Sequence, residues 1–281
     1  MLSRYPSLRS CVWEPLTQHG GLSGARLWLG HADGEPAFVS KRYPASVTGV
    51  SLGEVQVQML AAKQAAGEIV PTVMPNADGQ LWTAHSGRVW DVQTYRPGTP
   101  SRGSAAQVEA GLDLIRRLHA TWAHHGTVMR QPPGVAARLR VLRSWKPANR
   151  PNAVSELLGQ HQAEFVEQLQ VQQGVPCNCH WIHGDLHAQH LLFTKEGLTG
   201  VIDFAAGRVD LPAFDAIRWL TDVCPMSLHL WRDQSLDFRQ LRLLAGAGVL
   251  ASLVRWCDAG VDETHPRVSQ LLRSFQILQS C

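Results

Sequence analysis

The sequence predicts an α+β fold, with a small strand-rich part followed by a larger, mainly helical part. Up to about residue 95, short apolar runs alternate with polar residues, and turn-forming Gly, Asn and Asp residues separate them. Beyond that point apolar residues recur at the helical period of about 3.6, and we find neither internal repeats nor low-complexity tracts. Strands first and helices afterwards indicate an α+β architecture, which we divide into lobes at 1–95 and 96–281.

The composition is that of an ordinary globular protein. Of 281 residues, 44% are hydrophobic and 17% charged, and the net charge is +3 without long runs of Lys or Arg, so nothing favours nucleic acid as a partner. The absence of an export signal and of an apolar run of transmembrane length predicts a cytoplasmic chain that does not use a membrane. The cysteines are scattered, so we expect reduced thiols rather than a disulfide framework.

The first lobe is expected to open with a hairpin and a helix. Strands are predicted at 25–31 and 36–43, because Asp33-Gly34 between them is typical of a tight hairpin turn. An amphipathic helix follows at 51–66, and three short strands are expected between residues 69 and 95. These elements together form the predicted strand-rich lobe.

The predicted helices of the second lobe come from apolar stripes. Val108, Leu112, Ile115 and Leu118 mark one face of the first of them, and His119 on this helix is expected to be a core or boundary residue. The helices are predicted at 104–124, 152–171, 212–223, 235–257 and 266–278.

Two carboxylates in the second half of the chain indicate phosphoryl transfer. Asp185 lies in a Gly-containing loop before an apolar run, and Asp203 ends a predicted strand, where an unpaired buried carboxylate would be costly without a metal or partner. Transfer of a phosphoryl group needs one acid to orient the attacking hydroxyl and accept its proton, and another to hold the magnesium that neutralises the phosphates. Asp185 suits the first role and Asp203 the second.

The sequence motifs around these carboxylates resemble those of a known family. His183-Gly184-Asp185-Leu186-His187, an apolar run and then Val201-Ile202-Asp203-Phe204 are similar to the phosphotransferase family of aminoglycoside phosphotransferases, choline kinases and homoserine or fructosamine kinases. The resemblance implies a bilobal protein-kinase-like fold. It also implies ATP and Mg²⁺ as cofactors, and transfer of the γ-phosphoryl group to a hydroxyl of a small molecule of the aminoglycoside, amino alcohol or sugar class.

In the first lobe the resemblance implies a nucleotide site. The glycine-rich turn at 20–24 would cover the phosphates, although glycine clusters also form ordinary turns. Lys41, positioned by Glu54, would clamp the phosphates, and the backbone of the linker near 93–99 would meet the adenine edge. The implied cofactor-binding residues are Gly20, Gly21, Ser23, Gly24, Lys41, Glu54, Gln93 and Tyr95.

In the second lobe the resemblance assigns a brace and a metal ligand. Asp215 is implied to start a helix and to brace the catalytic loop. The family has Asn at the position of His190, where it binds the second metal, so His190 and Asp203 are the expected metal ligands. Imidazole prefers softer ions than Mg²⁺, which makes Mn²⁺ an alternative metal.

Two other functions stay open. If His190 abolishes the second metal site, the chain is a nucleotide-binding pseudokinase that acts through a partner. A metallohydrolase would use His183, Asp185, His187 and His190 with Asp203 as zinc ligands, but it does not explain the glycine-rich turn, Lys41 or Glu54. Cys177 and Cys179 have no second pair nearby and are expected to be free thiols.

The acceptor is left open as well. An aminoglycoside calls for a strongly acidic pocket, whereas a choline-like substrate calls for an aromatic cage. The candidates for the two are the acidic residues Asp210, Asp222, Asp233, Asp237, Asp258, Asp262 and Glu263, and the tryptophans Trp219, Trp231 and Trp256.

Overall fold

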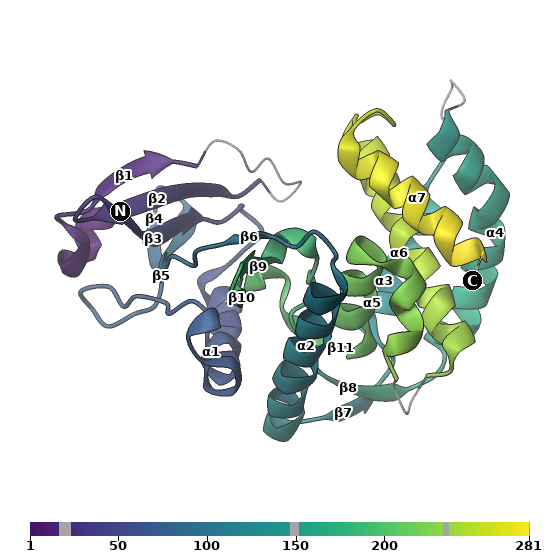
Figure 1. Cartoon of the computed structure of the whole chain (residues 1–281), viewed down its shortest axis with the longest axis horizontal. Helices are drawn as coiled ribbons and strands as arrows, with labels where there is room; N and C mark the ends of the chain where they lie inside the picture. Colours follow the sequence, from purple (N-terminus) through teal and green to yellow (C-terminus); the bar gives the residue numbers. More distant parts are fainter. Residues whose placement is uncertain (17–23, 147–151, 233–235, 281) are drawn as a thin grey trace. The chain divides into compact units, whose positions relative to one another are not determined.

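The computed structural model describes residues 1–16, 24–146, 152–232 and 236–280, and the chain divides into two compact units (Figure 1). The first unit consists of Met1–Thr99 with Leu192–Ala205, and the second of Pro100–Leu191 with Ala206–Cys281. The segment 192–205 therefore groups with the N-terminal residues, and the lobes at 1–95 and 96–281 stay a prediction.

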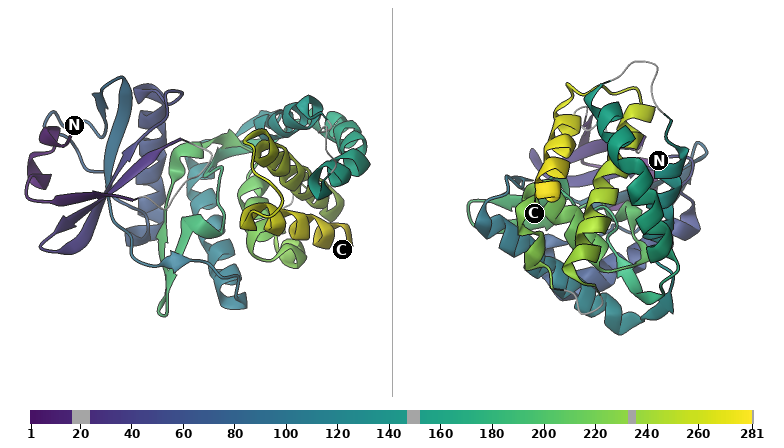
Figure 2. Two further views of the ribbon diagram at one scale, coloured as in Figure 1. Left: turned by 90° about the horizontal axis from the view of Figure 1, so that it is seen from above. Right: turned by 90° about the vertical axis from the view of Figure 1, so that its right-hand side faces the viewer.

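A five-stranded antiparallel sheet forms the body of the first unit (Figure 2). Its strands run in the order β1 (Val12–Pro15), β2 (Arg26–Ala32), β3 (Glu35–Arg42), β5 (Arg88–Thr94) and β4 (Thr83–His85). The predicted hairpin is confirmed, because β2 and β3 pair around a turn in which Asp33 and Gly34 have φ of 53° and 85°. Positive φ at both positions is what the tightest hairpin turn requires.

Helix α1 (Gly49–Ala66) confirms the predicted helix of this unit. Thr48 and Ser51 form a capping box at its start, which satisfies two backbone N–H groups that the helix leaves unpaired. Leu52, Val55 and Met59 lie on its buried face. The remaining elements are the 3-10 helices η1 (Leu2–Arg4), η2 (Pro6–Leu8), η3 (Gly67–Ile69) and η5 (Phe204–Ala206), and a small sheet of β10 (Gly197–Val201), β9 (Leu191–Thr194) and β6 (Thr99–Pro100).

The second unit is mainly helical, as predicted. Its helices are α2 (Ala105–His125), α3 (Pro133–Ser144), α4 (Ala153–Gln173), α5 (Ala213–Val223), α6 (Phe238–Asp258) and α7 (Pro266–Ser280) (Figure 1). The sequence pattern did not predict α3. Pro132 and Pro133 suggest a break, but Pro133 occupies the first turn, where the missing N–H of proline costs nothing.

A three-stranded sheet in this unit leads into the loop of Asp185. Strand β8 (Cys177–Ile182) lies between β11 (Arg208–Asp210) and β7 (Val128–Arg130), and the short helices η4 (Ala188–His190) and η6 (Pro225–Leu230) follow. The described cysteines are free thiols, and Cys177 and Cys179 are buried along β8. Among the residues that the structure describes, no helix combines the length and the apolar character needed to cross a membrane.

Candidate functional site

In the first unit Lys41 forms an ion pair with Asp203. Strand β3 carries Lys41, Asp203 follows β10, and Lys41 Nζ lies 2.6 Å from Asp203 Oδ1. Lys41 is 9% exposed, so its ammonium group is largely removed from water. Asp203 has φ of 63°, a left-handed conformation that is uncommon for a residue with a side chain and that concentrates at functional sites. The fold therefore brings one predicted phosphate ligand and one predicted metal ligand together.

A buried carboxylate, Asp91, lies directly across the sheet from Lys41. The two residues are opposite each other in the β3–β5 register, and Asp91 is fully buried. Its Oδ2 accepts hydrogen bonds from Tyr43 Oη and Gln93 Nε2, each at 2.9 Å, and from Gln56 Nε2 at 3.5 Å. Burial raises the pKa of Asp91, while Gln93, Lys41 and the other donors act in the opposite direction. The sequence analysis did not identify Asp91, although an Asp between Trp90 and Val92 in a strand next to the linker is a usable signal.

The predicted pairing of Lys41 with Glu54 is wrong. Glu54 is exposed on α1, and the ion-pair partner of Lys41 is Asp203. Helix phase explains the difference. Successive helical residues are about 100° apart, so Glu54 lies on the opposite side from Leu52 and Gln56, which face the protein interior.

The other predicted nucleotide residues are placed only in part. Gly20, Gly21 and Ser23 lie outside the described residues, whereas Gly24 is described and has φ of 68°. The side chain of Gln93 donates a hydrogen bond to Asp91. The backbone N–H of Tyr95 donates to Ala37 O at 2.8 Å, so any adenine contact at Tyr95 would use the carbonyl.

In the second unit Asp215 braces the loop that carries Asp185. Asp215 lies in the first turn of α5, and its two carboxylate oxygens accept the backbone N–H groups of His183 and Gly184, each at 2.8 Å. His119 Nε2 donates to the same carboxylate at 3.0 Å. Burial alone would raise the pKa of Asp215, but these donors outweigh it and hold the pKa below its usual value. Asp215 thus fixes the backbone of the two residues that precede Asp185, as the resemblance implies.

Gly184 is required by this loop. Its φ is 83°, and a side chain there would collide with the backbone of Ala206 and with Arg208. A residue with a Cβ would therefore have to displace the loop.

Asp185 is held by Arg218, which the sequence did not point to, and lies near His187, which the sequence offered only as a candidate zinc ligand. Arg218 Nε on α5 lies 3.1 Å from Asp185 Oδ1, and His187 Nε2 lies 3.7 Å from Oδ2. Arg218 follows Asp215 by one helical turn, so the two are expected on the same face, and this spacing was the available signal for Arg218. Arg218 thus holds Oδ1 of the carboxylate, and Oδ2 faces His187.

His190 lies beside Asp185 and His187. His190 Nδ1 donates to Asp185 O at 2.7 Å, and the His187 and His190 ring centroids are 3.9 Å apart. Asp185, His187 and His190 each offer one ligand atom, and within the described residues these atoms all lie within 4.8 Å of one another. Burial, followed by the positive charge of neighbouring groups, lowers the pKa of His187 well below its usual range, so the ring is neutral. The predicted ligand Asp203 belongs to the first unit.

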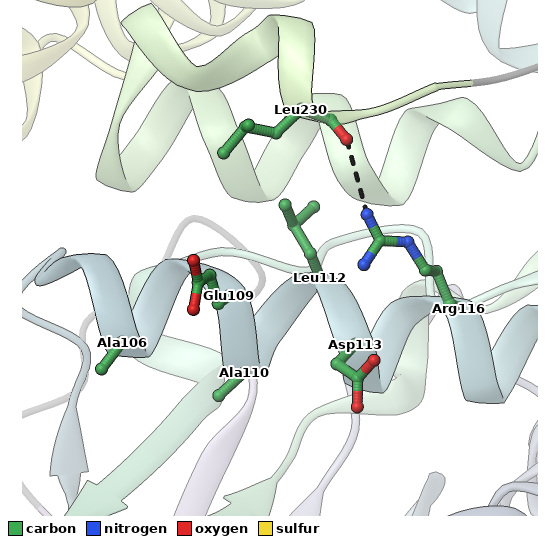
Figure 3. A pocket seen from close by; sticks show the side chains of 7 residues that line it. All are labelled: Ala106, Glu109, Ala110, Leu112, Asp113, Arg116 and Leu230. Carbon is green, nitrogen blue, oxygen red and sulfur yellow. Dashed lines mark hydrogen bonds between the residues drawn. The ribbon is translucent and has the colours of Figure 1, made fainter.

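A pocket of about 590 Å³ lies elsewhere in the second unit, over α2. Figure 3 shows Glu109, Asp113 and Arg116 on this helix, with Arg116 Nη2 donating to Leu230 O at 3.4 Å. Neither Asp185 nor its neighbours line this pocket, so we do not place the acceptor there.

A family model identifies the class of protein. The phosphotransferase enzyme family matches residues 16–262, and the chain belongs to this family. No curated protein sequence matches the chain.

Solved structures show the same fold with low sequence identity. An aminoglycoside phosphotransferase from Alicyclobacillus acidocaldarius is 13% identical, with a TM-score of 0.61, over 99% of this chain and 91% of the other. Spectinomycin phosphotransferase in complex with ADP and spectinomycin is 10% identical, with a TM-score of 0.61, over 95% and 91%. An amicoumacin kinase in complex with AMP-PNP and Ca²⁺ is 14% identical, with a TM-score of 0.64, over 99% and 91%. The α+β, kinase-like fold predicted from the sequence is thereby confirmed, and the chain is a phosphotransferase-family protein.

Proposed function

We propose that this chain transfers the γ-phosphoryl group of ATP to a hydroxyl group of a small molecule. The observation that carries the proposal is the ion pair of Lys41 with Asp203, from residues 162 positions apart in the sequence. A cation that binds phosphate and a carboxylate that binds metal are the two groups that phosphoryl transfer requires beside the nucleotide. The nucleotide-bound relatives support ATP as the donor.

Each residue then has a defined task. Lys41 neutralises phosphate oxygens, with Asp91 beside it in the sheet. Asp185 orients the acceptor hydroxyl and takes its proton while the hydroxyl oxygen forms a bond to the γ-phosphorus and the bond to the ADP oxygen breaks. Arg218 holds Asp185 Oδ1, so that Oδ2 is the oxygen which receives the proton.

The expected metal fits the donors that are present. Asp203 offers a carboxylate, and His190 offers Nε2 because its Nδ1 proton is directed to Asp185 O. A divalent ion held by either residue would neutralise charge on the phosphates. An imidazole donor such as His190 favours Mn²⁺ over Mg²⁺ more than the Asn that the family has at this position does.

The acidic residues of the second unit argue against a strongly cationic acceptor. Asp210 is fully buried and accepts from Gly134 N and Arg208 Nε, and Asp222 is buried and accepts from Ala188 N and Arg267. Asp237 caps α6, Asp262 accepts from Thr264, and Glu263 accepts from Ala153 N. Asp233 lies outside the described residues. Because the buried Asp210 and Asp222 already bind other parts of the protein, we infer that a neutral or singly charged amino alcohol or sugar is the better acceptor class.

Among the tryptophans, Trp219 is fully buried and donates to Val108 O, Trp231 is buried, and Trp256 stacks on His265 with ring centroids 4.9 Å apart. Trp219 is thus a core residue rather than part of an aromatic cage.

The proposal is tested by incubating the purified chain with ATP and either Mg²⁺ or Mn²⁺ against a panel of amino alcohols, sugars and aminoglycosides. Phosphorylated product is followed by mass spectrometry, and Asp185→Asn is the matched control. Product that appears with the unaltered chain and disappears with the variant supports the proposal. If ATP binds but no acceptor is phosphorylated with either metal, the pseudokinase becomes the better hypothesis.

A further inference from the structure

A third charged residue of helix α5, Asp222, contacts the loop that carries Asp185. Its Oδ2 accepts the backbone N–H of Ala188 at 2.8 Å. Asp222 follows Asp215 by about two helical turns and Arg218 by about one, so the three side chains lie along one face of α5. Asp215 binds the backbone just before Asp185, whereas Asp222 binds it just after. The loop is therefore held on both sides of its carboxylate.

The contact at Ala188 reaches Asp185 through the short helix η4. Ala188 is the first residue of η4, and its carbonyl accepts the N–H of Ser101 at 3.0 Å, so both of its backbone groups are bonded. His190, the last residue of η4, donates from Nδ1 to the carbonyl of Asp185 at 2.7 Å. A displacement of η4 would therefore displace the backbone that carries the carboxylate of Asp185.

Helix α7 holds Asp222 in place. The side chain of Asp222 is 1% exposed, and Arg267 in the first turn of α7 donates from Nη1 to its Oδ1. Gln270 on the same helix donates to the backbone carbonyl of Asp222 at 2.7 Å and accepts from Arg267 at 2.9 Å. A buried carboxylate without a partner is costly, so the charge of Arg267 fixes the direction in which Asp222 points.

We propose that Asp222, with Arg267 as its counter-charge, is a positioning residue that sets where Asp185 meets the acceptor hydroxyl. This inference rests on the proposed function, in which Asp185 takes the proton of the acceptor. A displacement of a reacting group by about 1 Å can cost on the order of a hundredfold in rate. Because Lys41 and Asp203 of the first unit hold the nucleotide in that proposal, the contribution of Asp222 falls on kcat and not on the KM for ATP.

Residue-resolved hydrogen exchange tests the contact without ATP or acceptor, and so apart from the reaction. Asp222→Ala should speed exchange of the Ala188 amide about tenfold or more, because that N–H loses its acceptor. The Gly184 amide, which Asp215 binds, is the internal control and should exchange at its former rate. If Asp222→Ala does not fold, Arg267→Gln replaces it, since this variant releases the carboxylate from α7. Unchanged exchange at Ala188 overturns the proposal.

Steady-state kinetics, with the acceptor found for the unaltered chain, tests the effect on the reaction. Asp222→Asn keeps an oxygen for Ala188 but loses the charge that Arg267 binds, so kcat should fall about tenfold or more while the KM for ATP stays within about twofold. Arg267→Gln should lower kcat to a similar extent. Arg267→Lys should lower it less, because a Lys ammonium can also pair with a single carboxylate oxygen.

Asp237→Asn is the matched control. Asp237 also accepts a backbone N–H at 2.8 Å, but it does so at the start of α6, where Asn caps a helix about as well as Asp does. This variant should therefore leave both kcat and the exchange of Ala188 unchanged.

Melting temperatures identify which variants are folded, and only folded variants are compared. A kcat within about twofold of that of the unaltered chain in both Asp222→Asn and Arg267→Gln overturns the proposal, as does a loss that appears in the KM for ATP alone. If the unaltered chain phosphorylates no acceptor, the proposed function fails, and exchange at Ala188 by itself decides whether Asp222 positions the loop.

Discussion

At the scale of single residues, Asp185 and Asp203 carry different parts of the proposed reaction. In the proposed reaction Asp185 Oδ2 receives the acceptor proton, whereas Asp203 is paired with Lys41 and lies in a left-handed conformation. A group that acts only on the acceptor affects turnover, and a group that holds metal also affects nucleotide binding. The two carboxylates should therefore be separable by substitution.

Asp185→Asn should reduce kcat by about a hundredfold or more, because general bases contribute roughly 10²–10⁴-fold, while nucleotide affinity stays near that of the unaltered chain. Asp203→Asn should also weaken binding of ATP in the presence of metal. Calorimetric titration of ATP with and without metal, combined with kcat, distinguishes the two. Near-normal turnover in both variants would contradict the assignment.

A second prediction concerns Lys41, which pairs with Asp203 and lies opposite Asp91 in the sheet. Glu54→Gln should leave the KM for ATP within about twofold, because the side chain is exposed. Asp91→Asn should raise that KM roughly tenfold, since Lys41 loses the charge beside it, and tenfold corresponds to about 1.4 kcal/mol. Steady-state kinetics at saturating acceptor measures both. A large effect of Glu54→Gln on this KM, with none from Asp91→Asn, would favour a pairing of Lys41 with Glu54.

At the scale of elements, helix α5 holds the loop that follows β8 through side-chain hydrogen bonds. The first turn of α5 supplies Asp215 to the backbone of His183 and Gly184, and the next turn supplies Arg218 to Asp185. Two turns of one helix thus position the loop backbone and the carboxylate that it carries.

Asp215→Asn should lower the free energy of unfolding by about 2–3 kcal/mol at neutral pH, as charged hydrogen bonds contribute about 1.5–3 kcal/mol. The folded state lowers the pKa of Asp215, so this contribution is present above the unfolded pKa of about 3.9 and is lost as pH falls through the folded pKa. Urea unfolding from pH 3 to pH 7 should show a constant difference between variant and unaltered chain above about pH 5, and a shrinking one below about pH 4. A difference that grows on acidification would refute this account.

Gly184→Ala should destabilise the chain by more than the roughly 1–2 kcal/mol that a left-handed conformation costs, because the added Cβ also collides with Ala206. Gly159→Ala is the matched control. That position lies in α4 with nothing within 4 Å of the added atom, so Ala should stabilise the helix by up to about 1 kcal/mol. Thermal unfolding of the two variants checks the opposite signs.

At the scale of the whole molecule, the two units contribute different functions to the proposal. Lys41 and Asp203 belong to the unit with the five-stranded sheet, and Asp185 and Arg218 belong to the helical unit. Nucleotide binding and acceptor activation are therefore expected to respond separately to substitution.

ATP with Mg²⁺ or Mn²⁺ should raise the melting temperature, because a ligand selective for the folded state stabilises it by about 2.7 kcal/mol at a hundred times its Kd. For a chain of this size each kcal/mol corresponds to about 2–4 °C. Lys41→Met should remove most of the shift. The absence of any shift at millimolar ATP with either metal would count against both the kinase and the pseudokinase.

The sequence alone determined the fold class, most of the helices, the β2–β3 hairpin and the motif that carries Asp185 and Asp203, because periodicity, turn chemistry and short motifs are local. The tertiary structure determined which side chains contact one another. Lys41 pairs with Asp203 instead of Glu54, and Arg218 and His187 flank Asp185. It also showed that most of the acidic candidates for substrate binding are structural. Such pairings join residues far apart in the chain and depend on helix phase and strand register, which local patterns specify too loosely to predict.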